Sequence, residues 1–343
     1  MEYMEYMRIR MIGIDLDGTL LTMDKELTEA SREALERAMA AGIEVVPVTG
    51  RPLAGVPAEV LELPGIRYII TSNGANTYDL SLWEGHRAAE PSAGNGSSQG
   101  RAAEAADGLS AEAVSSAGTR SGREEINAAL LIARPVPREA VLRMSHLPHE
   151  TVRRILEAAE GEDVIREIFV RGVGYHDART QKMLEERFSF RPPILNYINR
   201  SREIVPDFEA VLSDASSHVE NISLMFPSQE RRDGVFEKLK KIRGENGERI
   251  LHVLLPWVTD LEVTHILADK WLAVQDLAGR LGIAAGEIMT LGDGDNDRPM
   301  LQHAGLGVAM GNAPDFVKKT ADRITLDNEH DGAAAAIREI LDQ

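Results

Sequence analysis

The chain has 343 residues, which exceeds what one hydrophobic core usually organises, so we expect two domains. Its hydrophobic content of 43% is ample for a core. Its formal net charge of -17 disfavours a general binder of nucleic acid or of an anionic membrane, because both partners require a basic surface. The lack of cysteine excludes disulfides, thiolate catalysis and thiolate metal sites, and it favours a reducing cytoplasmic location.

The first seven residues carry acids where a secretory signal carries bases, and no apolar segment follows them. The sequence has no run of about 18 apolar residues, the minimum for a transmembrane helix. We therefore expect a soluble globular protein.

The first regular element ends in a pair of acids. Residues 8–14 are β-branched and apolar, which predicts a buried parallel strand. Asp15 and Asp17 follow it, and two residues at this spacing on an extended chain point to the same side. Paired acids at a buried strand end are costly unless a cation or a reaction needs them. We therefore predict a functional site at this strand end.

Helices and strands then alternate along the chain. Thr28 is predicted to cap a helix over residues 31–41, which ends at Gly42. Strands are predicted at 43–48 and 67–71, and each is followed by polar residues. This alternation predicts a doubly wound parallel sheet, in which ligands bind beyond the carboxyl ends of the strands.

The middle of the chain has a different pattern. Residues 84–123 are rich in Ala, Gly, Ser, Glu and Arg without any hydrophobic period, which predicts a flexible insertion. Short strands mixed with helices follow and predict a separate α+β unit. We expect helices near 150–160, 178–187 and 228–242, and strands near 164–171, 202–205, 219–226, 250–255 and 260–264.

The α/β alternation returns after Lys270. We expect a helix over 271–281, strands over 288–292 and 305–310, and a closing helix over 331–341. These elements predict one α/β core domain built from residues 1–80 and 265–343, with residues 81–264 inserted as a second domain. A cleft between two such domains is the default place for a ligand.

Four polar clusters lie at strand ends or helix starts: Asp15 with Asp17, Thr49 with Arg51, Lys270, and Asp293 with Asn296 and Asp297. Carboxylates together with backbone and water oxygens suit Mg²⁺ and not a soft metal. A hydroxyl, a lysine and backbone N–H groups at helix starts can hold a phosphate. Once cations neutralise the phosphoryl oxygens, one carboxylate can attack phosphorus while a second transfers the proton.

These clusters resemble, in order, the four motifs of the haloacid dehalogenase (HAD) superfamily. The matching segments are residues 15–19 (Asp-Leu-Asp-Gly-Thr), 49–51 (Thr-Gly-Arg), Lys270 and 292–297 (Gly-Asp-Gly-Asp-Asn-Asp). The segments at 72–75 and 307–313 further resemble the Cof-type subfamily, subclass IIB, which carries a large cap between its second and third motifs. The resemblance covers about residues 8–83 and 258–343, and it implies a Rossmann-like core with an inserted α+β cap.

The resemblance also implies roles for individual residues. Asp15 corresponds to the nucleophile that forms an aspartyl-phosphate, and Asp17 to the general acid/base. Thr49 and Lys270 correspond to residues that hold the phosphoryl group, with Lys270 also orienting Asp15. The resemblance places further phosphate or substrate contacts at Gly50, Arg51 and Asn296.

A magnesium site is implied by the same comparison of motifs. Its ligands would be the Asp15 side chain, the Asp17 backbone carbonyl and Asp293, with Asp297 in direct or indirect support. For Arg51, a substrate contact and an ordinary place at a helix start are both consistent with the sequence.

The sequence therefore predicts a Mg²⁺-dependent phosphatase for a small phosphorylated metabolite, such as a sugar phosphate or a phosphorylated cofactor. A large cap that closes over the site would exclude macromolecules. Two alternatives stay open: a phosphomutase or phosphoryl transferase that uses the same intermediate, and a non-catalytic regulatory protein on this scaffold. The last alternative predicts the loss of a motif acid, and every motif acid is present.

Overall fold

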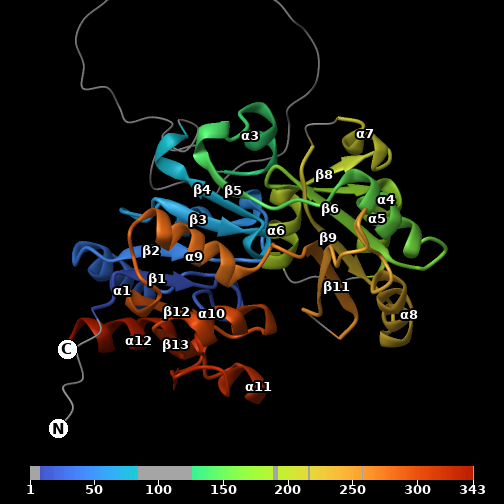
Figure 1. Ribbon diagram of the computed structural model, residues 1–343. Helices are drawn as coiled ribbons and strands as arrows, with labels where there is room; N and C mark the ends of the chain where they lie inside the picture. The colour runs from blue at the N-terminus through green and yellow to red at the C-terminus, as the bar shows by residue number, and fades with distance from the viewer. Residues whose placement is uncertain (1–7, 84–125, 188–191, 215–216, 257, 343) are drawn as a thin grey trace, which may run out of the picture.

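The structure, a computed structural model, describes residues 8–83, 126–187, 192–214, 217–256 and 258–342. Figure 1 shows two lobes, one around strands β1, β2, β12 and β13 and the other around β6, β9 and β11. We call them the core domain and the cap domain. The flexible insertion predicted at 84–123 lies outside the described residues.

The core domain is built on a five-stranded sheet in the order β14-β13-β12-β1-β2. Every pairing in it is parallel, as predicted. Strand β1 is central because it pairs with β12 on one side and with β2 on the other. The strands are β1 (Met11–Ile14), β2 (Glu44–Pro47), β12 (Ile288–Gly292), β13 (Leu306–Ala309) and β14 (Arg323–Ile324).

Helices cover both faces of this sheet, because alternate side chains of its strands are apolar on both sides. Ile12 and Ile14 of β1 pack with one cluster that includes α1 and α12, whereas Met11 packs with another that includes α9 and α10. The Thr28 hydroxyl accepts a hydrogen bond from the Ser31 N–H and caps α1, as predicted. The helices are α1 (Glu29–Ala40), α2 (Ala58–Leu61), α9 (Lys270–Arg280), α10 (Arg298–His303), α11 (Asp315–Lys318) and α12 (Gly332–Leu341).

A second, antiparallel sheet extends the core domain. It consists of β3 (Tyr68–Thr71), β4 (Asn76–Asp79) and β5 (Val141–Met144), and a single parallel bridge between Val48 and Ile70 links it to the main sheet. Helix α3 (Ala128–Ala133) packs on the same apolar cluster as β1. Both β5 and α3 lie within residues 81–264, the range predicted for the inserted domain. The domain boundary predicted between residues 80 and 81 stays a prediction.

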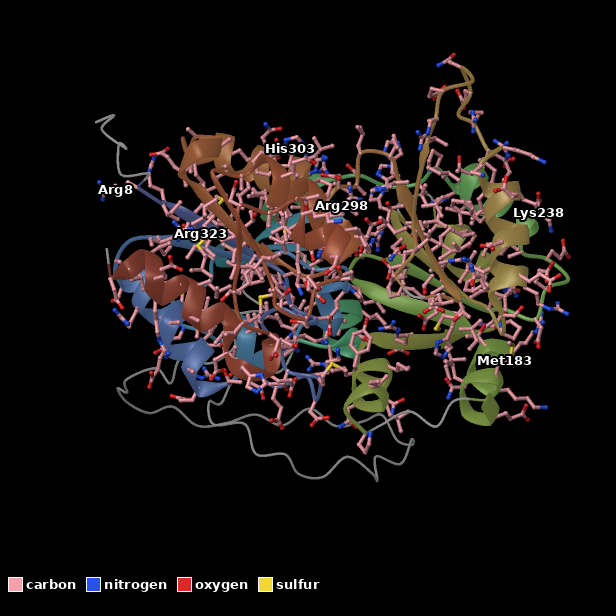
Figure 2. All side chains as sticks on the ribbon, turned by 90° about the horizontal axis from the view of Figure 1, so that it is seen from below. Arg8, Met183, Lys238, Arg298, His303 and Arg323 are labelled. Atoms are coloured by element: carbon pink, nitrogen blue, oxygen red, sulfur yellow. The ribbon has the colours of Figure 1, made fainter. Side chains whose placement is uncertain are left out.

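The cap domain has a six-stranded sheet in the order β10-β11-β9-β6-β7-β8. Its strands are β6 (Ile165–Val170), β7 (Val173–Asp177), β8 (Arg202–Val205), β9 (Val219–Met225), β10 (Leu251–Leu254) and β11 (Asp260–His265). Its helices are α4 (His149–Ala158), α5 (Ala178–Arg187), α6 (Pro192–Ser201), α7 (Glu209–Leu212) and α8 (Gln229–Leu239). Met183 and Lys238 lie in this lobe, and Arg298 and His303 lie in the core lobe (Figure 2).

Short 3-10 helices complete the described chain: η1 (Leu53–Gly55), η2 (Ser72–Gly74), η3 (Leu80–Leu82), η5 (Arg138–Ala140), η6 (Ala285–Glu287), η7 (Asp295–Asp297) and η8 (Asn328–His330). Two of them, η2 and η7, lie beside the predicted site. Within the described residues, the helices are all too short or too polar to span a membrane.

The cap domain contains a buried ion pair between Glu167 on β6 and Arg202 on β8. The guanidinium Nε and Nη2 donate to the two carboxylate oxygens, each at 3.1 Å. Both side chains are less than a tenth exposed. Burial alone would raise the pKa of Glu167, but Arg202 outweighs it and holds that pKa at about 2.

Replacement of Glu167 with Gln is expected to lower the free energy of unfolding by about 3 kcal/mol near neutral pH, because Arg202 would stay buried without its counter-ion. The depressed pKa means that the carboxylate stabilises the fold fully above about pH 4.5, and that this contribution is lost as the pH falls toward 2. Urea unfolding of the wild type and E167Q should therefore converge in acid. In the control E186Q, the exposed Glu186 changes stability little at any pH. A pH-independent difference between wild type and E167Q would contradict this account.

Candidate active site

The carboxyl ends of the three central strands bring the predicted site residues together. Asp15 directly follows β1, Asp293 follows β12, and Thr49 comes two residues after β2. Because β12, β1 and β2 are parallel neighbours, these residues share one edge of the sheet. The Asp15 N–H continues the ladder by donating to the Leu291 carbonyl at 3.1 Å. Asp15 is 5% exposed.

Lys270 is the first residue of α9, and its side chain enters this edge from the helix start. Its ammonium donates to Asp15 Oδ1 at 2.7 Å and to Asp297 Oδ1 at 2.6 Å. The residue is 1% exposed. Burial would lower the pKa of Lys270, but the two carboxylates outweigh this effect and raise the pKa above its ordinary value. Lys270 is therefore a buried ammonium ion.

The acids Asp15, Asp293 and Asp297 form a cluster in which each offers an oxygen within 4.8 Å of the others. Three carboxylates face one ammonium, so the cluster carries an excess of negative charge. Burial, together with repulsion among the acids, raises the pKa of Asp15 well above its ordinary value and that of Asp293 to about 6. An all-oxygen set with this charge fits a hard divalent cation such as Mg²⁺.

Two further features fix the positions of the loops around this acid cluster. Asp297 uses its second oxygen to accept the backbone N–H groups of Asp293 and Gly294, at 3.0 and 2.8 Å, so it holds the loop that carries Asp293. Gly18 has a φ of +81°, and a Cβ added there would collide with the Asp293 carboxylate. The loop after β1 therefore approaches the acids more closely than a residue with a side chain allows.

Asp17 has different neighbours from Asp15. Its carboxylate accepts two hydrogen bonds from Arg51, both at 2.6 Å, and pairs with Lys25 at 2.7 Å. Burial would raise its pKa, but the two cations hold the pKa well below the usual range. The Asp17 carboxylate is not part of the acid cluster, and the predicted metal contact through its backbone carbonyl stays a prediction.

The predicted phosphate-binding residues lie around the same edge. The Thr49 hydroxyl accepts the Arg51 N–H at 3.1 Å, and within the described part of the chain its own proton has no acceptor. Asn296 donates to Asn73 Oδ1 at 2.9 Å. Gly50 lies beside them on the wall of the cleft.

The cleft itself has a volume of about 620 Å³ and is lined from both domains. Asp15, Asp17, Asp293 and Asn296 line the core side. The cap side includes Tyr197, Arg202, Ser223 and Glu262. A cleft is therefore present between the two domains, and its use as the ligand site stays a prediction.

Two contacts of the site were missed by the sequence analysis. Lys25, which pairs with Asp17, comes from a loop with no recognisable motif. Asn312 donates to Asp293 Oδ2 at 3.2 Å and to the Gly18 carbonyl at 2.8 Å. Asn312 lies in the segment 307–313 that resembles the Cof-type tail, so a signal for it was present.

Residues 12–85 and 129–337 match a family model described as haloacid dehalogenase-like hydrolase, which covers most of the chain. The chain belongs to this family. The resemblance predicted from the four motifs is therefore confirmed, and the chain is an enzyme of a hydrolase family.

Individual relatives agree with this assignment. The putative phosphatase YxeH of Bacillus subtilis is 27% identical over 97% of this chain and 98% of its own. The 5-amino-6-(5-phospho-D-ribitylamino)uracil phosphatase YcsE of B. subtilis is 41% identical, but over only 31% of this chain and 41% of its own. A solved haloacid dehalogenase-like hydrolase of B. subtilis has a TM-score of 0.70 at 22% identity, covering 96% of this chain and 99% of that one. This structural likeness confirms the predicted fold.

Replacement of Lys270 with Met is expected to destabilise the fold by about 3 kcal/mol or more, because Asp15 and Asp297 would lose the ammonium that compensates their burial. In the matched control K182M, Lys182 is 72% exposed and pairs with Glu186 on the surface of α5, so a change within about 0.5 kcal/mol is expected. Chemical unfolding of both variants measures the difference. Equal losses in the two variants would show that the Lys270 contacts do not stabilise the core domain.

Proposed function

We propose that this protein is a Mg²⁺-dependent phosphatase that hydrolyses a small phosphorylated metabolite through an aspartyl-phosphate on Asp15. The observation that carries the proposal is the position of Asp15, which is bound to the Lys270 ammonium at 2.7 Å within a three-acid cluster at the edge of the cleft. A carboxylate in this setting can approach a phosphoryl group despite its charge, because cations offset the repulsion.

Asp15 would act as the nucleophile. Among the described residues, only Lys270 donates a hydrogen bond to its carboxylate, and it does so to Oδ1. The other oxygen is left to form the bond to phosphorus. The fixed ammonium orients the carboxylate, which reduces the entropy lost on reaching the reactive geometry.

Asp293 and Asp15 would hold the Mg²⁺ ion, with the Asp17 backbone carbonyl as a further ligand and Asp297 positioning the loop. The bound ion would supply charge neutralisation at the phosphoryl oxygens and orient the phosphoryl group. The protein residues that would hold the same group are Thr49, through its free hydroxyl proton, and Lys270. Gly50 and Asn296 line the wall beside them and are proposed as further contacts.

Asp17 would transfer the protons. Its pairing with Arg51 and Lys25 keeps it ionised, which suits the step in which it accepts a proton from the attacking water. Protonation of the leaving oxygen needs the opposite state, so Asp17 would have to loosen its contact with Arg51 when substrate binds. Arg51, from the segment after β2 in the core domain, would thus control the protonation state of the acid/base residue.

Hydrolysis is favoured over transfer to a second substrate by the relatives of this chain. YxeH, which matches it over almost its whole length, is named a putative phosphatase. YcsE acts, by its name, on a phosphorylated ribitylamino compound, which supports a small metabolite as the substrate here. A cleft of about 620 Å³ suits a substrate of that size.

Replacement of Asp15 with Asn is expected to reduce p-nitrophenyl phosphate hydrolysis at least about a thousandfold, because the nucleophile is lost while its shape is kept. The control D276N changes a half-buried acid on α9 that pairs with Arg280 and has no proposed role, and it should keep wild-type turnover. Steady-state kinetics of both variants measure the effect. Wild-type turnover by D15N would refute the assignment.

Removal of divalent cations is expected to abolish turnover and to leave the fold intact, because Lys270 still compensates two of the three acids. Dialysis against EDTA followed by titration with Mg²⁺ should restore the activity, and circular dichroism should show the same secondary structure throughout. Full activity in EDTA would argue against a metal-dependent reaction.

A further inference from the structure

The cap domain has a second groove, which shares no lining residue with the cleft between the domains. It lies between strand β10 and helix α8, which is on the side of the cap away from the core domain (Figure 1). Its volume is about 380 Å³. Val253 of β10 lines the groove, whereas the next residue, Leu254, lines the cleft, so the strand separates the two.

The floor of the groove is apolar. Phe236 and Leu239 are three residues apart on α8 and therefore lie on the same side of the helix. Leu251 and Val253 are two residues apart on β10 and lie on the same face of the sheet. All four belong to or pack against the apolar cluster of the cap. A chain bound in the groove would therefore bury apolar surface.

The rim of the groove is basic. Lys240, Arg243 and Arg249 line it, and no acidic side chain of the described residues does so. Lys240 pairs with Glu237 on α8, but neither arginine forms an ion pair with another described residue. The protein as a whole has a net charge of -17, so this rim is a local excess of positive charge. Such a rim attracts an acidic ligand.

Strand β10 is an edge of the cap sheet, and no other described strand pairs with its outer side. The Ile266 N–H donates to the Ile250 carbonyl, so alternate residues from Ile250 onward turn their backbone groups toward β11. Leu251 and Val253 therefore turn theirs outward. Exposed edges are usually blocked by lysine, proline or a bulge, and the four residues of β10 have none of these. The edge is open to a further strand.

The edge and the rim together select one kind of occupant. The outward backbone groups of β10 repeat at the spacing of an extended polypeptide, a pattern that neither a nucleic acid nor a lipid headgroup matches. A second copy of this chain, paired through the same edge, would bring its own three cations against these three, which is unfavourable. An extended segment of another protein with carboxylate side chains satisfies both features.

We propose that the groove between α8 and β10 binds an extended acidic segment of a partner protein, which adds to the six-stranded cap sheet beside β10. The backbone groups of Leu251 and Val253 pair with the added strand, and Arg243 and Arg249 pair with its carboxylates. The groove is separate from the cleft, so the proposal does not rest on the phosphatase function.

The test uses three fluorescently labelled peptides and the full chain. Glu-Val-Glu-Val-Glu-Val has the expected charge and can extend the sheet, Glu-Val-Glu-Pro-Glu-Val keeps the charge but lacks one backbone N–H, and Lys-Val-Lys-Val-Lys-Val reverses the charge. Fluorescence anisotropy should show the first peptide binding at least about tenfold more tightly than either of the others. Equal affinity for the first two would overturn strand addition, and no binding of the first would overturn the site itself.

Variants of the groove locate the bound peptide. R249E should weaken binding of the first peptide at least about fivefold, because an attractive pair becomes a repulsive one. V253P removes an outward N–H, keeps the pairing of β10 with β11, and should weaken binding by a similar factor. The control K182E makes the same charge change as R249E at a side chain that is 72% exposed on α5, and its affinity should stay within about twofold of the wild type.

Two results with these variants would overturn the proposal. If R249E and V253P bind the first peptide as K182E does, the peptide binds elsewhere. If light scattering shows that the wild type self-associates and that V253P does not, a second copy covers the edge. Urea unfolding checks that V253P is folded. If it is not, R249E decides between the outcomes, because the side chain that it changes is exposed.

Discussion

The ammonium of Lys270 joins parts of the core domain that the sequence separates by up to 255 positions. Buried ions are tolerated only when their partners are in place, so the hydrogen bonds to Asp15 and Asp297 require α9, β1 and the loop after β12 to be assembled together. Asp297 then holds the backbone of Asp293. The same contacts that compensate the buried charge thus place the three acids around one point.

A strained turn connects this site to the cap domain. Ser72 and Asn73 have φ values of 51° and 57°, and left-handed backbone in residues other than glycine costs about 1–3 kcal/mol each. Each donates to a cap acid, Ser72 to Glu220 at 2.8 Å and Asn73 to Glu262 at 2.5 Å. Gly74, at a φ of +89°, lets the turn pack against the start of α9. The position of the cap is therefore coupled to the helix that carries Lys270.

Much of the core domain could be predicted because its strands are apolar runs that end in polar motifs, as β1 and β12 do. Strand β3 was predicted as a strand, but its antiparallel partner β4 follows a turn that depends on tertiary contacts of Ser72 and Asn73. Strand β7 (Val173–Asp177) was not predicted, because Gly174 and His176 are not residues that indicate a strand by their apolar or β-branched side chains. Lys25 and Glu262 lie in no recognisable sequence motif. Their place at the cleft could not be predicted, because only the tertiary fold brings them there.

The account depends above all on covalent catalysis by Asp15. The most direct measurement is a rapid acid quench of the enzyme during turnover of p-nitrophenyl phosphate with Mg²⁺, followed by peptide mass spectrometry. We predict one added phosphoryl group on the peptide that contains Asp15, and none on the same peptide from D15N. A wild-type enzyme that turns over under these conditions with its Asp15 peptide unmodified, or with the phosphoryl group on another residue, would contradict the account.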